Sequence, residues 1–392
     1  MIETLDLDSL ETFEIEVLPR RRRPWRVWSG LKWVVRTVGS GLEWIFGAVS
    51  LVIGLSVLAA LPILQFLSLG YLLEASGRVA RSGRFRDGWI GVRRAGRVGS
   101  LVAGVGLWLW PGLFVSSLAT SAELIDPDGP MALAWRRVLA FVVLLTILHM
   151  AASCARGGRL RHFAWPPGSL IWLFKRLRRG GLYVESRDAT LAYVERLRLP
   201  DYFRLGFLGF MGTSAWLAIP VTLLALGRRV PPVGLLGALS LGIVAMGLPF
   251  LQVRFAMEGR FAAVFEVKAV RERFRRAPWA FALSFFLLAV AAIPLYLLKI
   301  ELVPKEATWL PSLVFVAFLF PSRLLCGWAY GRGARRETRR HWVWRGIGRL
   351  AMLPAAAFYV LVVFLAQYTS WGGIWDLYEQ HAFLLPVPFL GY

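Results

Sequence analysis

The sequence predicts an all-α polytopic membrane protein, a transmembrane helical bundle of about eight spans arranged as repeated helical hairpins with basic amphipathic linkers. Hydrophobic residues make up 57% of the 392-residue chain, against about 45–50% in soluble domains. Eight separate stretches are apolar and long enough to cross a bilayer, which takes roughly 20 residues per helix. None of them alternates in polarity as a barrel strand does. Because lipid offers no partner for a free backbone amide, the spans are expected to be helices.

The predicted spans and their linkers leave no room for a sizeable soluble domain. The spans lie near residues 44–72, 99–120, 138–155, 204–227, 231–253, 278–299, 308–330 and 350–369. Residues 1–43 are predicted to be an acidic and then basic tail with a Trp-rich interfacial helix. Residues 44–369 would form the transmembrane bundle, and residues 370–392 a short non-cytoplasmic tail.

The basic residues indicate which side of the membrane each linker faces. The net charge of +22 would be compatible with nucleic-acid binding, but the arginines lie in the connections between spans. The basic linkers 73–97, 156–203, 254–277 and 331–349 all follow odd-numbered spans. They therefore share one side, which the positive-inside rule makes cytoplasmic. We expect a multi-pass protein of the cell inner (cytoplasmic) membrane, with no nucleic-acid partner.

The first span conflicts with this scheme. Eight full crossings place the N-terminus outside, whereas the basic run Arg20–Arg26 is expected inside. The span contains Pro62, so it is either a tilted and kinked full crossing or a segment that dips in and returns. We favour the full crossing because of an internal repeat.

The repeat joins two proline-containing segments. Leu61-Pro62-Ile63-Leu64-Gln65 recurs as Leu248-Pro249-Phe250-Leu251-Gln252, and each copy closes an odd span before a basic linker. The span that follows each copy contains a proline, Pro111 in one and Pro294 in the other. Duplication predicts that Pro62 and Pro249 occupy equivalent kinks.

The first copy of this repeat resembles a known family. A proline-containing helix, a Gly-Tyr-Leu-Leu step, a basic helix and a turn into a second membrane helix are similar to the bacterial membrane family catalogued as domain of unknown function 4013. The resemblance covers about residues 45–120 and brings no activity with it. It is carried by Pro62, Leu69-Gly70-Tyr71-Leu72-Leu73, Arg78, Arg81, Gly83 and Asp87-Gly88-Trp89.

Catalytic and cofactor signatures are missing from the sequence. It has no His-Glu-x-x-His pair, no Gly-x-Ser-x-Gly elbow and no Gly-x-x-x-x-Gly-Lys phosphate loop. The four histidines are scattered, and the two cysteines are isolated. We therefore expect no enzyme activity, no cofactor and no metal site.

Polar residues within or bordering the spans are the candidate functional residues, because such groups are costly in lipid. We predict a polar cluster near the cytoplasmic ends that binds a lipid headgroup, with Arg254 and Arg323 contacting phosphate and two glutamates orienting them. The alternatives are a neutral imidazole bonded to a neighbouring helix, glutamines that hold helices together, glutamates that form plain interfacial salt bridges and an arginine that snorkels to the surface. The predicted residues are Gln65, Glu74, His149, Gln252, Arg254, Glu258 and Arg323.

The predicted function is that of a membrane scaffold or lipid-interacting protein with an arginine-rich cytoplasmic face. Its predicted partners are the lipid bilayer and anionic phospholipid headgroups, and no protein partner is predicted. One alternative is a permease-like transporter, because internal repeats and proline-broken helices are typical of that class. A second alternative is an intramembrane lipid-modifying enzyme.

Overall fold

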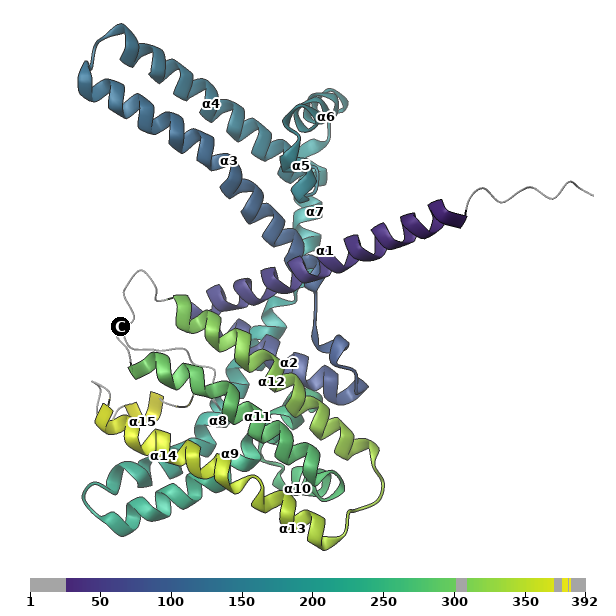
Figure 1. Cartoon of the computed structure of the whole chain (residues 1–392), viewed down its shortest axis with the longest axis vertical. Helices are drawn as coiled ribbons and strands as arrows, with labels where there is room; N and C mark the ends of the chain where they lie inside the picture. The colour runs from purple at the N-terminus through teal and green to yellow at the C-terminus, as the bar shows by residue number, and fades with distance from the viewer. Residues whose placement is uncertain (1–25, 301–308, 370–375, 380, 382–392) are drawn as a thin grey trace, which may run out of the picture. The chain divides into compact units, whose positions relative to one another are not determined.

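A computed structural model describes residues 26–300, 309–369, 376–379 and 381 (Figure 1). The chain divides into two units, Met1–Glu43 and Trp44–Tyr392. Every contact discussed below lies within the second unit. The described residues form α-helices and short 3-10 helices and no strand, so the predicted all-helical fold is confirmed.

The helices follow one another with short connections. In chain order they are α1 (Arg26–Ala60), α2 (Gln65–Ser82), η2 (Phe85–Gly88), α3 (Val92–Ile125), α4 (Pro130–Ala155), α5 (Leu160–Ala164), α6 (Pro166–Arg179), α7 (Leu182–Leu197), α8 (Leu199–Leu226), α9 (Pro231–Glu258), η3 (Phe261–Phe265), α10 (Val267–Arg276), α11 (Pro278–Ile300), α12 (Trp309–Arg335), α13 (Trp342–Leu350), α14 (Leu353–Thr369) and α15 (Asp376–Glu379).

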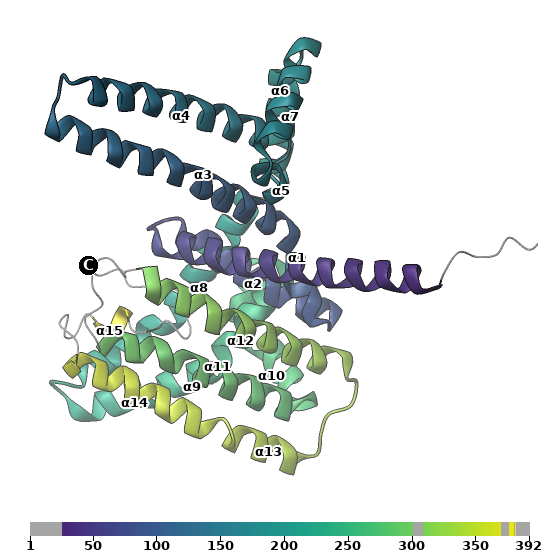
Figure 2. The same ribbon diagram turned by 45° about the horizontal axis from the view of Figure 1, so that its top comes forward.

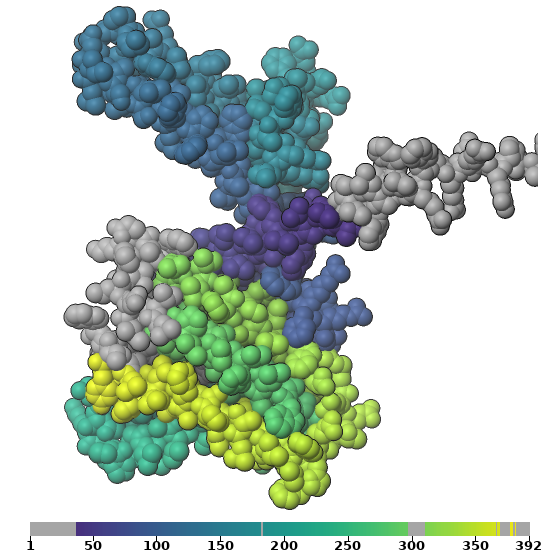
Figure 3. Space-filling model, in the orientation of Figure 1, coloured from purple at the N-terminus to yellow at the C-terminus, as the bar shows by residue number. Residues whose placement is uncertain are grey.

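Eight helical stretches among the described residues are long and apolar enough to cross a membrane, which matches the predicted number. They differ in how far the protein covers them. In the most apolar part of the stretch along α3 only 6% of the residues are buried, whereas in the stretch along α12 61% are buried. On the face seen in Figure 3, α11 lies between α12 and α14.

The first predicted span is two helices. α1 ends at Ala60, and α2 begins at Gln65 after a turn in which Ile63 has a φ of 68°. Pro62 explains the break, because it lacks an N–H and disfavours helical geometry in the residue before it. The chain then returns: the ring of Trp44 lies 5.2 Å from that of Trp89, beyond the end of α2. A single kinked helix over residues 44–72 is therefore wrong.

α2 is the most enclosed of these helices, with neighbours α8, α9 and α12. It crosses α8 at a pair of glycines. A Cβ on Gly70 would lie 1.8 Å from the carbonyl oxygen of Tyr202, and one on Gly206 would lie 1.9 Å from that of Phe66. Such small residues let membrane helices pack backbone to backbone. The predicted Gly-Tyr-Leu-Leu step therefore lies at a helix crossing.

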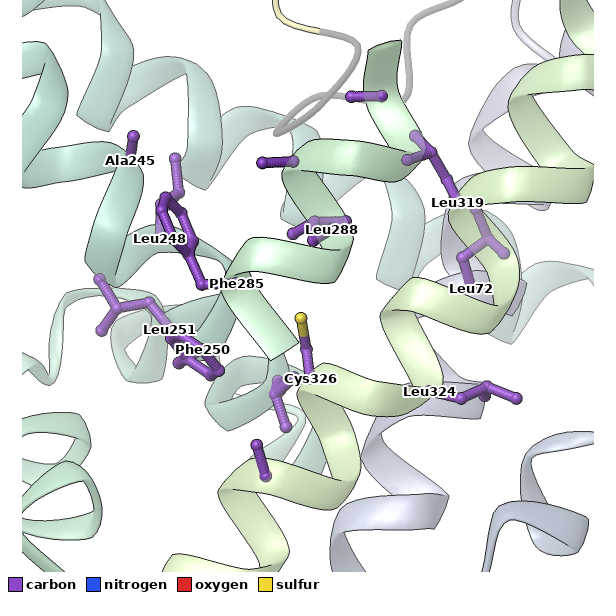
Figure 4. Close-up of a cluster of buried hydrophobic side chains, with 14 of the residues drawn as sticks. Leu72, Ala245, Leu248, Phe250, Leu251, Phe285, Leu288, Leu319, Leu324 and Cys326 are labelled. Carbon is purple, nitrogen blue, oxygen red and sulfur yellow. The ribbon is translucent and has the colours of Figure 1, made fainter. Parts of the chain in front are cut away.

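The hydrophobic core of the second unit is built around these helices. Figure 4 shows side chains of α9, α11 and α12 meeting, with Leu248, Phe285 and Leu319 among them. All three are fully buried. Views from two directions show α9, α11, α12 and α14 running alongside one another (Figures 1 and 2). The buried network of Arg323, Gln252 and Thr213 described below joins helices of this core, whereas the buried His149 lies apart from it in α4.

The internal repeat has a different register from the predicted one. Pro62 lies in the break between α1 and α2, whereas Pro249 lies inside the continuous helix α9, so the predicted equivalence of these prolines is wrong. The structure instead repeats a Gly-Arg-Phe/Leu turn after α2, α4 and α9. In each copy a left-handed glycine is followed by an extended arginine and a short helical turn, at Gly83-Arg84-Phe85, Gly158-Arg159-Leu160 and Gly259-Arg260-Phe261.

Two of these turns are held by the same hydrogen bond from a tryptophan. The indole Nε1 of Trp108 donates to the carbonyl of Phe163 at 2.8 Å, and that of Trp216 donates to the carbonyl of Val264 at 3.0 Å. Each acceptor lies five residues after its glycine. In the first copy the Tyr71 hydroxyl donates to the carbonyl of Ile90 at 3.1 Å. That acceptor lies seven residues after Gly83, so only the copies after α4 and α9 share an equivalent bond, while the turn itself recurs three times and supports the predicted repetition of helical hairpins.

Candidate functional site

The seven predicted polar residues do not form one cluster. The structure distributes them over a buried network between α9 and α12, ion pairs at the ends of α9 and α2, and a separate corner at α4. Gln65 begins α2 and is 6% exposed.

The buried network joins α12, α9 and α8. Arg323 donates from Nη1 to Oε1 of Gln252. The Nε2 of Gln252 donates to Oγ1 of Thr213 at 2.6 Å, and that hydroxyl donates to the carbonyl of Gly209 at 2.8 Å. Arg323 is only 2% exposed. The guanidinium of Arg323 is therefore enclosed by the protein, which fits neither the predicted phosphate contact nor the alternative of snorkelling to the cytoplasmic surface.

Arg254 is engaged by carboxylates at the end of α9. Its Nη1 lies 2.7 Å from Oε1 of Glu258, and its Nε and Nη2 donate to Oε2 of Glu266 at 2.9 and 2.7 Å. The hydrogen bonds from Arg254 lower the pKa of Glu266, which lies outside the spans. Glu258 thus contacts Arg254 as expected. The sequence does not place Glu266 beside Arg254, because only the turn at η3 brings this residue back to α9.

Glu74 lies in a similar arrangement on α2. Its Oε1 accepts from Nε of Arg78 at 2.8 Å and pairs with Nη2 of Arg81 at 3.2 Å. Arg81 also donates to the carbonyls of Ala256 and Met257 at 3.2 and 3.3 Å. These are carbonyls of the last turn of α9, where a cation is favoured by the helix dipole. Glu74 therefore orients an arginine that joins α2 to α9.

His149 lies with none of the other predicted residues. Its fully buried ring is 4.5 Å from the Trp108 ring, and its Nε2 is 3.1 Å from the carbonyl of Phe163. This is the hydrogen-bonded histidine of the alternative interpretation. Within the described ranges no three His, Cys, Asp or Glu side chains come together as metal ligands would.

A pocket that the sequence analysis did not predict lies where α11 begins and α12 ends, with α13 beside it. Its volume is about 440 Å³, within the range of about 300–1,000 Å³ typical of small-molecule sites. Aromatic and cationic side chains dominate its wall. The lining residues are Ala277, Pro278, Trp279, Ala280, Leu283, Trp328, Arg332, Arg336, Arg340 and Trp344.

The three arginines of this pocket differ from their neighbours in charge pairing. Arg332, Arg336 and Arg340 have no carboxylate at ion-pair distance among the residues that the structure describes, whereas Arg339, one position away, lies 2.9 Å from Glu272. Arg332 lies in the last turn of α12, whereas Arg336 and Arg340 follow the helix end, and all three line the pocket. The only sequence signal was membership of a basic linker, which did not separate paired from unpaired arginines.

Two contacts fix these cations in place. The guanidinium of Arg332 lies 5.3 Å from the centroid of the Trp328 ring, a cation–π contact. Arg336 and Arg276 each donate to the other's backbone carbonyl, at 3.4 and 3.0 Å. Burial, followed by repulsion from Arg332 and Arg340, lowers the pKa of the Arg336 guanidinium. A bound anion would relieve that repulsion.

The fold and its apolar helices define a multi-pass integral membrane protein. Comparison with protein-family models, with curated proteins and with solved structures finds no match to this chain. The proposals below therefore rest on the residues and contacts of the chain itself.

Proposed function

We propose that this chain is a non-enzymatic, lipid-interacting scaffold of the bacterial inner membrane, whose arginine-rich cytoplasmic face binds anionic phospholipid headgroups. The observation that carries the proposal is the pocket of Arg332, Arg336 and Arg340. Cations without counterions beside tryptophan, at the end of a span, suit a phosphate at the membrane interface. Arg254, the phosphate contact expected from the sequence, is already bound by two carboxylates.

The test uses purified full-length protein and vesicles of phosphatidylcholine with or without phosphatidylglycerol. We expect the wild type to retain phosphatidylglycerol at least tenfold better than the triple variant Arg332→Gln, Arg336→Gln, Arg340→Gln. A matched control replaces three exposed arginines outside the pocket, at positions 84, 86 and 93. Equal retention by the two triple variants would contradict the proposal.

The membrane orientation is a second part of the proposal. The basic linkers after α2, α4, α9 and α12 would face the cytoplasm. The contact between Trp44 and Trp89 supports a hairpin of α1 and α2 whose two ends lie on one side of the membrane, in place of a single crossing. Reporter fusions at Arg94, Arg179, Arg273 and Arg336 should all report the cytoplasm, and one clear periplasmic signal would contradict the scheme.

The permease alternative is favoured by one observation, the hydrogen-bonded chain from Arg323 through Gln252 to Thr213 inside the helix packing. Transporter sites lie between helices near the bilayer midplane. Solute flux in vesicles that is lost on Thr213→Val would support this alternative over the scaffold. If the wild type shows no flux of amino acids, sugars or inorganic ions, the network of Arg323, Gln252 and Thr213 has a structural role and the permease alternative is excluded.

A further inference from the structure

We infer that the pocket of Arg332, Arg336 and Arg340 selects a phospholipid that carries two phosphates over one that carries a single phosphate. This inference rests on the proposed headgroup binding and names the ligand class of the same site. It follows from the charge of the pocket, the shape of its wall and its position at the ends of two spans.

The charge of the pocket exceeds what one phosphodiester neutralises. Three guanidinium groups face it, and among the described residues no carboxylate pairs with them. The adjacent arginine cluster, in contrast, contains a carboxylate: Glu272 lies 2.9–3.6 Å from Arg275, Arg276 and Arg339. A single phosphodiester would leave two positive charges in the pocket, whereas a headgroup with two phosphates would leave one.

The arginines are also spread along the wall in a way that suits two phosphates. Arg332 lies in the last turn of α12, Arg336 follows the helix end, and Arg340 lies in the connection to α13. Phosphate recognition by arginine uses several N–H donors for each anion. The Nη1 of Arg336 donates to the carbonyl of Arg276, and this hydrogen bond holds the Arg336 side chain, the middle one of the three arginines in sequence.

The apolar part of the wall favours a lipid over a soluble diphosphate. Trp279 and Trp344 pack edge to face with ring centroids 6.3 Å apart, and both are about half exposed (48% and 49%). Leu283, one turn further into the α11 span, is 50% exposed. Tryptophans of this kind mark the membrane–water interface, and basic pockets between membrane helices on the cytoplasmic side suit lipids with two phosphates.

The experiment measures lipid retention by the full-length protein in native mass spectrometry, with cardiolipin and phosphatidylglycerol supplied at equal phosphate concentration. We expect the wild type to retain cardiolipin at least tenfold better. The variant Arg332→Gln, Arg336→Gln, Arg340→Gln should lose that preference, whereas Arg84→Gln, Arg86→Gln, Arg93→Gln should keep it, since both variants lose three positive charges.

The outcomes separate this inference from the proposed function. Equal retention of the two lipids by the wild type, lost in the pocket variant, would overturn the preference for two phosphates and leave headgroup binding intact. Retention of both lipids by the pocket variant would overturn both. Displacement of cardiolipin by inorganic pyrophosphate at equal phosphate concentration would show a soluble ligand and overturn the lipid assignment. Should the pocket variant misfold, Arg340→Gln alone, which lies outside any helix, is expected to reduce the cardiolipin preference.

Discussion

The crossing of α2 and α8 provides the sharpest test of the fold. In Gly70→Ala the new Cβ would lie 1.8 Å from the carbonyl oxygen of Tyr202 and 3.0 Å from the amide nitrogen of Gly206. Both neighbours are backbone atoms, so no side-chain rotation relieves the overlap. Reaching the 3.0 Å at which Cβ contacts begin to occur requires the helices to separate by about 1.2 Å (3.0 minus 1.8). Overpacking of this kind costs about 3 kcal/mol, since the contacts along the whole crossing are loosened.

The assay is the thermal loss of monodisperse protein in detergent, followed by fluorescence-detected gel filtration. Gly247→Ala is the matched control, because it lies in α9 and its Cβ would meet nothing within 4 Å. The control is expected to unfold at the wild-type temperature or slightly above it, because Ala favours helix. Equal stability of the two variants would refute the close backbone crossing.

Two further predictions concern the polar groups. Gln252→Leu removes an acceptor from the buried guanidinium of Arg323 and should destabilise the fold by about 3 kcal/mol; wild-type thermal stability in that variant would contradict the network. Glu266→Gln should destabilise the protein fully above about pH 4.3, the usual pKa of Glu. A carboxylate whose folded-state pKa is lowered stabilises the fold above its usual pKa, and this stabilisation is lost as the pH falls through the lowered pKa. A stability difference between wild type and Glu266→Gln that is independent of pH would exclude the ion pair with Arg254 as its cause.

Some of the predicted site followed from local sequence, and some did not. Glu258 was expected to orient Arg254 in a headgroup cluster, and the two do meet, because they are four residues apart on one helix and helical neighbours at that spacing lie side by side. Glu266 was missed because the turn that returns it to α9 depends on a left-handed glycine and on the hydrogen bond from the Trp216 indole to the carbonyl of Val264. Spacing in the sequence carries no information about such a return.

The proline repeat illustrates a different failure. Pro62 and Pro249 occur in nearly identical pentapeptides, yet one lies in a helix break and the other within a helix. A proline inside a membrane helix is tolerated where neighbouring helices satisfy the freed backbone groups. Whether a proline breaks or bends a helix thus depends on its neighbours. The Gly-Arg-Phe/Leu turns repeat more faithfully, because their conformation is encoded locally by glycine.

The sequence by itself determined the class of this protein, the number of its long apolar helical stretches and the linkers that carry its positive charge. These properties depend on apolar length and on charge along the chain, and both can be read without knowing which helices meet. Only the tertiary structure decided which arginines have counterions. Arg254 of α9 meets the carboxylate of Glu266 after the turn at η3, whereas the buried Arg323 of α12 meets the neutral amide of Gln252 of α9. The pocket of Arg332, Arg336 and Arg340 exists because α11, α12 and α13 come together without bringing a carboxylate to it.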